Sequence, residues 1–138
     1  MESKHRSEKG ASSQSAQLCA ERDVDVVGLW KGLREQATEI SAGEPGLQSL
    51  LTEVVLEQPC LGSALGMRLA RKLAREDMTS KELSPLLMGV LLEHPALVMS
   101  AASDMSAIVE RDPACSTALE PLLYYKGFLA ITTYRISH

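Results

Sequence analysis

The chain has 138 residues, a formal net charge of −4 and a pI near 5.4. That length suits one domain, or one domain with a tail, and a hydrophobic content of 45% can fill a core, although only 4% of the residues are aromatic. An acidic chain is a poor partner for nucleic acid, because phosphate binding requires a basic face. No apolar run approaches the ~20 residues that cross a bilayer, so no membrane partner is expected either.

Residues 1–22 are expected to form a flexible, disordered tail. They include five serines and mixed charges, and such a segment buries too little apolar surface to offset its ordering entropy. It lacks the apolar stretch of a secretory signal. Glu2, Glu8 and Glu21 also make it unlike the acid-poor transit peptides. The folded domain is therefore expected over residues 23–138.

Helices are predicted throughout the domain, because its apolar residues recur at three- and four-residue steps. Five apolar faces follow one another: Val26, Trp30, Leu33, Ala37 and Ile40; Leu47, Leu50, Leu51, Val54 and Val55; Leu61, Leu65, Leu69 and Leu73; Leu83, Leu86, Leu87, Val90 and Leu91; and Val98, Ala101, Ala102, Met105, Ile108 and Val109. Gly43 is expected to end the first helix in the left-handed backbone conformation. Thr79 and Glu82 are expected to form a capping box at the start of the fourth helix.

A sixth helix is predicted to begin near Pro121 and to be apolar on nearly every side. Such a helix is either central in a bundle or covered by a second partner. Gly127 inside it costs about 1 kcal/mol relative to Ala, which suggests that another backbone approaches closely there. The helix reaches His138 without a stop signal, so we expect the natural helix to continue. No stretch alternates as a strand does, and the predicted fold is all-α, a bundle of about six helices.

Asp112 is the candidate site residue. Because it precedes Pro113, it is pushed out of the α region and must lie in a break between helices. An Asp–Pro pair is a common helix N-cap and first turn, and the spacing alone favours that structural role. The alternative is that the carboxylate faces a cation, either Arg111 or the ammonium group of an amino-acid substrate.

Asp104 and the basic run at 68–75 are weaker candidates for a functional site than Asp112. Asp104 lies two helical turns before Asp112, about 12 Å away, which is too far for a carboxylate pair, so we expect a solvated residue or a contact between subunits. The basic run at 68–75 has its leucines on one face. In an acidic chain it is best interpreted as the solvated face of an amphipathic helix rather than a phosphate site.

The cysteines and histidines indicate no metal site. Cys19, Cys60 and Cys115 have no metal-ligand spacing, and we expect reduced thiols in a cytosolic protein rather than a disulfide. His94 and His138 have no neighbour that would make either one a general base.

Three short sequence motifs near the end of the chain occur together in one known family. They are R-D-P-A at 111–114, P-L-L-Y-x-K-G-F-x-A at 121–130 and Y-R-I-x-H at 134–138, preceded by L-G-S-A-L at 61–65 and S-A-A-S-D at 100–104. In this order they resemble the N-terminal helical domain of serine O-acetyltransferases, from about Val26 to His138.

The resemblance implies an activity for the complete enzyme. The family transfers the acetyl group of acetyl-CoA to the hydroxyl of L-serine, giving O-acetyl-L-serine for cysteine biosynthesis. Its histidine general base and acetyl-CoA groove belong to a following left-handed β-helix of hexapeptide repeats, and no such repeat occurs up to His138. The chain alone is therefore expected to hold no catalytic residue, cofactor or metal and to be inactive. The resemblance gives Asp112 one role, which is to bind the amino group of serine.

The resemblance also implies partners. Family members are typically cytoplasmic hexamers, two trimers joined through these helical domains, and they dock into cysteine synthase through a C-terminal tail that this sequence lacks. The alternative is that the chain is a truncated, non-catalytic helical interaction module that associates with itself or with full-length subunits.

Overall fold

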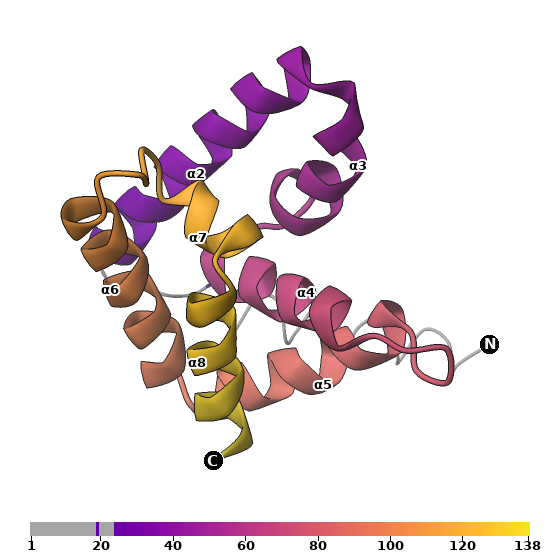
Figure 1. The fold of residues 1–138 in the computed structure, drawn as a ribbon. Coiled ribbons are helices and arrows are strands. Elements are labelled where there is room, and N and C mark those ends of the chain that lie inside the picture. Colours follow the sequence, from indigo (N-terminus) through magenta and orange to yellow (C-terminus); the bar gives the residue numbers. More distant parts are fainter. Residues whose placement is uncertain (1–18, 20–23) are drawn as a thin grey trace.

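The computed structural model describes Cys19 and residues 24–138, and within that part the chain is helical (Figure 1). The expected tail over residues 1–22 lies outside the described residues, apart from Cys19. The α-helices are α2 (Val24–Gly43), α3 (Gln48–Leu51), α4 (Leu61–Leu73), α5 (Ser80–Glu93), α6 (Ala96–Arg111), α7 (Leu119–Tyr124) and α8 (Lys126–Ser137). A 3₁₀ turn, η1 (Pro45–Leu47), and a π turn, η2 (Thr52–Leu56), flank α3.

No strand occurs among these residues, and a single isolated bridge joins Arg75 to Met78 in the turn between α4 and α5. The predicted all-α class is confirmed. The core lies where the apolar faces of the helices meet, and its fully buried side chains come from most of the chain: Leu33, Leu51, Val54, Val55, Leu61, Leu65, Leu69, Leu91, Met105, Leu119 and Leu122. In Figure 1, α6 and α8 lie side by side while α4 packs against α5.

The prediction of one continuous helix with the apolar face Leu47, Leu50, Leu51, Val54 and Val55 is wrong. The segment begins with the 3₁₀ turn at Pro45, continues as the short α3 and ends in the π turn, where the Glu57 N–H donates to the Thr52 carbonyl at 2.8 Å. Widening the turn by one residue changes which side chains face inward. Val54 and Val55, which lie in this turn, are both 0% exposed.

The prediction of a single sixth helix is also wrong, because the structure divides this segment into α7 and α8 at Tyr125 (φ −83°, ψ 101°). Arg68 of α4 binds at this break: its Nε donates to the Leu122 carbonyl at 3.0 Å and its Nη2 to the Leu123 carbonyl at 2.9 Å. The guanidinium therefore satisfies carbonyl groups that have no helical partner beyond the end of α7. Arg68 is half-buried, which corrects the interpretation of the basic run at this one residue. The other basic residues of the run are exposed as predicted: Arg71, Lys72 and Arg75.

Two predictions about glycines are wrong. Gly43 is the last residue of α2, and no glycine among the described residues has a positive φ. A Cβ on Gly127 would meet nothing within 4 Å, so no backbone approaches there. The close approach occurs instead at Gly66 of α4, where a Cβ would lie 2.9 Å from Cγ of Met88 on α5.

The capping box at the start of α5 is confirmed. The Glu82 N–H donates to the Thr79 hydroxyl at 3.3 Å, and the Thr79 N–H donates to the Glu82 carboxylate at 3.3 Å. The apolar face predicted for this helix is only partly right, because Leu87 and Leu91 are buried whereas Leu86 is 60% exposed.

The expectation that all three cysteines are reduced thiols is wrong. Cys19 forms a disulfide with Cys60, with 5.4 Å between their Cα atoms. Cys60 is the N-cap of α4, and a pairing over 41 residues has no local spacing signature. Cys115 is free and buried.

In the part of the chain that the structure describes, no single helix is long and apolar enough to cross a membrane. Only α5 and α6 taken together would meet that test on length and composition, and they are bent by 96° at their junction.

Candidate functional site

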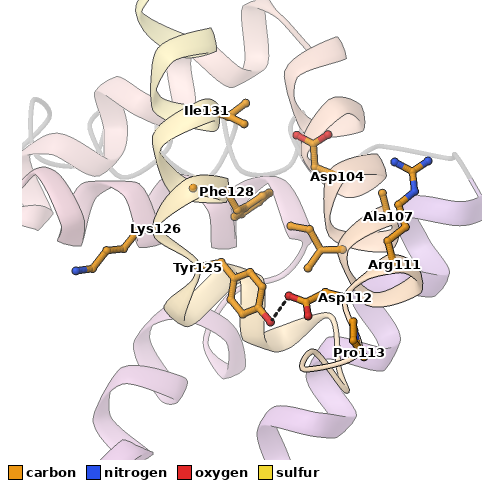
Figure 2. Close-up of a pocket in the computed structure, with 11 residues that line it drawn as sticks. Asp104, Ala107, Arg111, Asp112, Pro113, Tyr125, Lys126, Phe128 and Ile131 are labelled. Atoms are coloured by element: carbon orange, nitrogen blue, oxygen red, sulfur yellow. Dashed lines mark hydrogen bonds between the residues drawn. The ribbon is translucent and has the colours of Figure 1, made fainter.

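An open pocket of about 830 Å³ lies between α6, the turn that follows it and the first half of α8 (Figure 2). Ile108, Phe128 and Ile131 give it an apolar side. Asp112 and Tyr125 face each other across its lower end in Figure 2. An apolar cavity with a few converging polar groups is the usual form of a small-molecule site.

Asp112 reaches the pocket because the chain leaves the helical conformation there. It is the C-cap of α6 (φ −96°, ψ 110°), as Pro113 requires, and its N–H still donates to the Ile108 carbonyl at 2.9 Å. The predicted break is confirmed, but the predicted helix N-cap is not found. Oδ1 of Asp112 instead accepts from the Ala114 N–H at 2.9 Å, so the side chain caps a short turn.

The second carboxylate oxygen of Asp112 is held by a residue that sequence reasoning missed. The Tyr125 hydroxyl donates to Oδ2 at 3.2 Å, as the dashed line in Figure 2 marks. Helical periodicity placed Tyr125 inside a continuous helix, and no local signal marked it as the break. A hydrogen bond with the Cys115 thiol, partial burial and the nearby charge of Asp112 raise the pKa of Tyr125, so the hydroxyl remains a donor.

Asp112 has no cationic partner within residues 24–138. The two ion pairs in this part of the chain are Arg71–Glu53 and Arg135–Asp104. Arg111 and Lys126 also line the pocket, but both side chains point away from the Asp112 carboxylate in Figure 2. Arg111 therefore does not fill the cationic role considered from the sequence, and a half-buried carboxylate without a counter-charge faces the pocket.

Asp104 also lines the pocket and is only partly solvated. Its Oδ2 forms an ion pair with Nη1 of Arg135 at 2.6 Å, and the two side chains are 33% and 35% exposed. Asp104 is therefore not a fully solvated residue, and a contact between subunits stays a prediction. The ion pair joins α6 to α8 along one wall of the pocket.

The remaining titratable candidates lie away from Asp112 or are already engaged. The Cys115 thiol donates to the Thr117 carbonyl at 3.2 Å, and burial raises the pKa of this thiol. His94 is the C-cap of α5, and the His138 ring stacks on Tyr134 at 4.3 Å. Among the residues with described positions, no three His, Cys, Asp or Glu side chains are grouped as a metal site would need.

The chain is similar to known proteins over most of its length. A family model described as "Serine acetyltransferase, N-terminal" matches residues 29–133. The serine acetyltransferase of Haemophilus influenzae is 38% identical over 113 residues, which are 82% of this chain and 42% of that enzyme. The mitochondrial serine acetyltransferase 3 of Arabidopsis thaliana is 36% identical over 118 residues, 86% of this chain and 30% of that protein.

Solved structures agree in fold. The Neisseria gonorrhoeae serine acetyltransferase in complex with serine has a TM-score of 0.77 and 37% identity, over 86% of this chain and 47% of that one. The soybean enzyme complexed with serine has a TM-score of 0.79 and 32% identity, over 85% of this chain and 48% of that one. The chain thus spans less than half the length of the relatives it matches.

Proposed function

The chain belongs to the serine acetyltransferase family, as its N-terminal helical domain, and we propose that Asp112 supplies the carboxylate that binds the ammonium group of L-serine. The complete enzyme would transfer an acetyl group from acetyl-CoA to serine, giving O-acetyl-L-serine and CoA. One observation carries the assignment of Asp112. It is a half-buried carboxylate, oriented by hydrogen bonds on both oxygens, that faces an open pocket without a cation of its own.

The proposed role is one of binding and orientation. In the reaction, the serine hydroxyl oxygen attacks the thioester carbonyl, a base takes the hydroxyl proton and CoA leaves as its thiol. A carboxylate that holds the ammonium group fixes where the hydroxyl lies, which makes the attack effectively intramolecular. A charge-assisted contact of this kind is worth about 1.5–3 kcal/mol.

No histidine lines this pocket, and the histidine general base of the family lies outside the helical domain. General base catalysis contributes roughly 10²–10⁴-fold. We therefore expect residues 24–138 alone to leave serine unacetylated, and the family resemblance assigns both the base and the acetyl-CoA groove to a β-helical half. A relative solved in complex with CoA supports acetyl-CoA as the co-substrate of such an enzyme.

Two further parts of the proposal concern the domain as a whole. We propose that it joins copies of the enzyme, as the hexamers of the family imply, and that the enzyme works in the cytoplasm. One plant relative is named as mitochondrial, so location varies among relatives. The alternative function, a non-catalytic interaction module, is favoured by the exposed apolar side chains of α8, Ile131 at 50% and Tyr134 at 63%.

The ammonium contact is testable in this chain by an NMR titration. We expect L-serine to shift the amide resonances of Asp112, Ala114 and Tyr125, with a dissociation constant on the order of 10 mM for a single contact of this strength. We expect 3-hydroxypropionate, which lacks the ammonium group, to leave them in place. Asp112→Asn keeps the shape and the turn hydrogen bond but removes the charge, and should weaken serine binding at least about tenfold.

The control is Glu110→Gln, which removes one exposed carboxylate of α6 close to the site. It should bind serine as the unchanged chain does. Equal serine-dependent shifts in the Asp112→Asn variant, or equal shifts with 3-hydroxypropionate, would show that the carboxylate does not bind the ammonium group.

A further inference from the structure

We propose that Tyr125 is a positioning residue of this site, whose hydroxyl holds the Asp112 carboxylate in the orientation that receives an ammonium group. This inference rests on the proposed function of Asp112. It starts from the geometry in Figure 2, where the Tyr125 ring lies across the lower end of the pocket and its hydroxyl donates to Oδ2 of Asp112 at 3.2 Å.

The two donors on Asp112 come from two different parts of the chain. Oδ1 accepts from the Ala114 N–H at 2.9 Å, within the same turn, and Oδ2 accepts from Tyr125 at the start of α8. With one donor only, the carboxylate could still rotate about its Cβ–Cγ bond. With a donor on each oxygen its plane is fixed, and the lone pairs that remain can face the pocket.

The position of Tyr125 is itself fixed from the core. Tyr125 lies two residues after Leu123, whose carbonyl Arg68 binds at 2.9 Å, and Arg68 also binds the Leu122 carbonyl at 3.0 Å. Arg68 belongs to α4, so the α7–α8 break is anchored to the centre of the bundle rather than to the turn that carries Asp112. A rigidly held second residue is what an oriented binding group requires.

The neighbouring tyrosine supplies a matched control. Tyr124 is adjacent in sequence but is 53% exposed and does not line the pocket. Tyr125→Phe and Tyr124→Phe each remove a single hydroxyl oxygen and keep the ring. They therefore separate the hydrogen bond to Asp112 from any general effect of losing a tyrosine hydroxyl.

The experiment uses this chain with ¹³C-labelled aspartate and measures three quantities in the two variants. They are the carboxyl ¹³C resonance of Asp112 without ligand, the L-serine affinity by titration and the melting temperature. We expect Tyr125→Phe to move the Asp112 resonance and to weaken serine binding by about three- to tenfold, as loss of one hydrogen bond on the binding group implies. Tyr124→Phe should change neither.

The outcomes separate this inference from the function on which it rests. If the unchanged chain shows no serine-dependent shift, the proposed function is wrong and the positioning role is wrong with it. If the unchanged chain binds serine and Tyr125→Phe binds it equally well or more tightly, only the positioning role is overturned. A lower melting temperature in Tyr125→Phe with unchanged serine affinity would also overturn it, because the hydroxyl would then serve stability alone.

Discussion

Pro113 is the reason that Asp112 can serve as a binding group. A residue before proline is excluded from the helical conformation, so α6 ends at Arg111 and the next carboxylate turns out of the helix. The same proline has no N–H, and the first free donor in the turn is the Ala114 N–H, which Oδ1 of Asp112 accepts at 2.9 Å. The Asp112–Pro113 dipeptide therefore both ends the helix and places the carboxylate where one of its oxygens accepts from the Ala114 N–H.

A second carboxylate near the site, Glu120, has a structural role that can be tested through pH. Its Oε2 accepts from the Ser116 N–H at 2.7 Å and the Thr117 N–H at 3.2 Å. Hydrogen bonds from the Thr117 and Ser116 backbones, in that order of size, lower the pKa of Glu120. Because the pKa is lower in the folded chain, this stabilisation is present above the unfolded value of ~4.3 and is lost as the pH falls through the folded pKa.

We therefore expect Glu120→Gln to lower the free energy of unfolding at pH 7 and to approach the unchanged chain at pH 3. Urea denaturation at the two pH values measures the difference. Glu110→Gln, at an exposed acid of α6, is the control for the loss of one negative charge. A difference between Glu120→Gln and the unchanged chain that stayed constant down to pH 3 would contradict a role for the ionised carboxylate.

At the scale of elements, the break between α7 and α8 decides the shape of the site. It places Tyr125 at the pocket and directs α8 along α6 (Figure 1). Asp104 of α6 and Arg135 of α8 form their ion pair there. Apolar residues alone would favour one continuous helix through this segment. The side chain of Arg68 makes the break favourable, because it bonds the carbonyls of Leu122 and Leu123. Burial and the charge of Arg71 lower the pKa of Arg68.

Arg68→Met should therefore destabilise the domain by about 2–3 kcal/mol, since it removes a charged donor and leaves two carbonyl groups near the core without that partner. Chemical denaturation measures the change. Lys72→Met, at an exposed cation of the same helix, should stay within about 0.5 kcal/mol of the unchanged chain. Equal effects of the two substitutions would mean that Arg68 contributes only as one of several surface charges.

At the scale of the whole molecule, α8 leaves apolar side chains without a cover. The helix that the sequence predicted to be apolar on nearly every side buries some of these side chains and exposes others. Phe128 is 4% exposed and belongs to the core, and Ile136 packs against it, whereas Ile131 and Tyr134 are 50% and 63% exposed. Exposed apolar groups of this kind often mark a protein–protein contact.

We expect the chain to self-associate as a dimer or larger through α8. Sedimentation at ~100 μM would detect any association stronger than about −5.5 kcal/mol. The double substitution Ile131→Glu, Tyr134→Glu should give a monomer. Leu86→Glu, which changes an exposed leucine of α5, is the matched control and should leave the association intact. A monomer in the unchanged chain at that concentration would contradict the prediction.

The sequence by itself determined the features that depend on near neighbours. The apolar spacing of Trp30, Leu33 and Ala37 predicted the buried face of α2, and Thr79 predicted the cap of α5. Asp112 was located in a break because Pro113 follows it. Each of these rests on residues at most four apart, where backbone sterics and helical period control the outcome.

Only the tertiary structure decided the features that join distant residues. The Asp112–Tyr125 hydrogen bond spans 13 residues, the Arg135–Asp104 ion pair 31, the Cys19–Cys60 disulfide 41 and the Arg68 bond to Leu122 54. None has a local pattern, because each forms only after the helices pack and bring the two partners together. The same packing reversed one local expectation, since Gly127 is open and the close approach occurs instead where Gly66 meets Met88. The position of Asp112 is thus set by its own dipeptide, whereas its orientation is set by a residue that the fold brings to it.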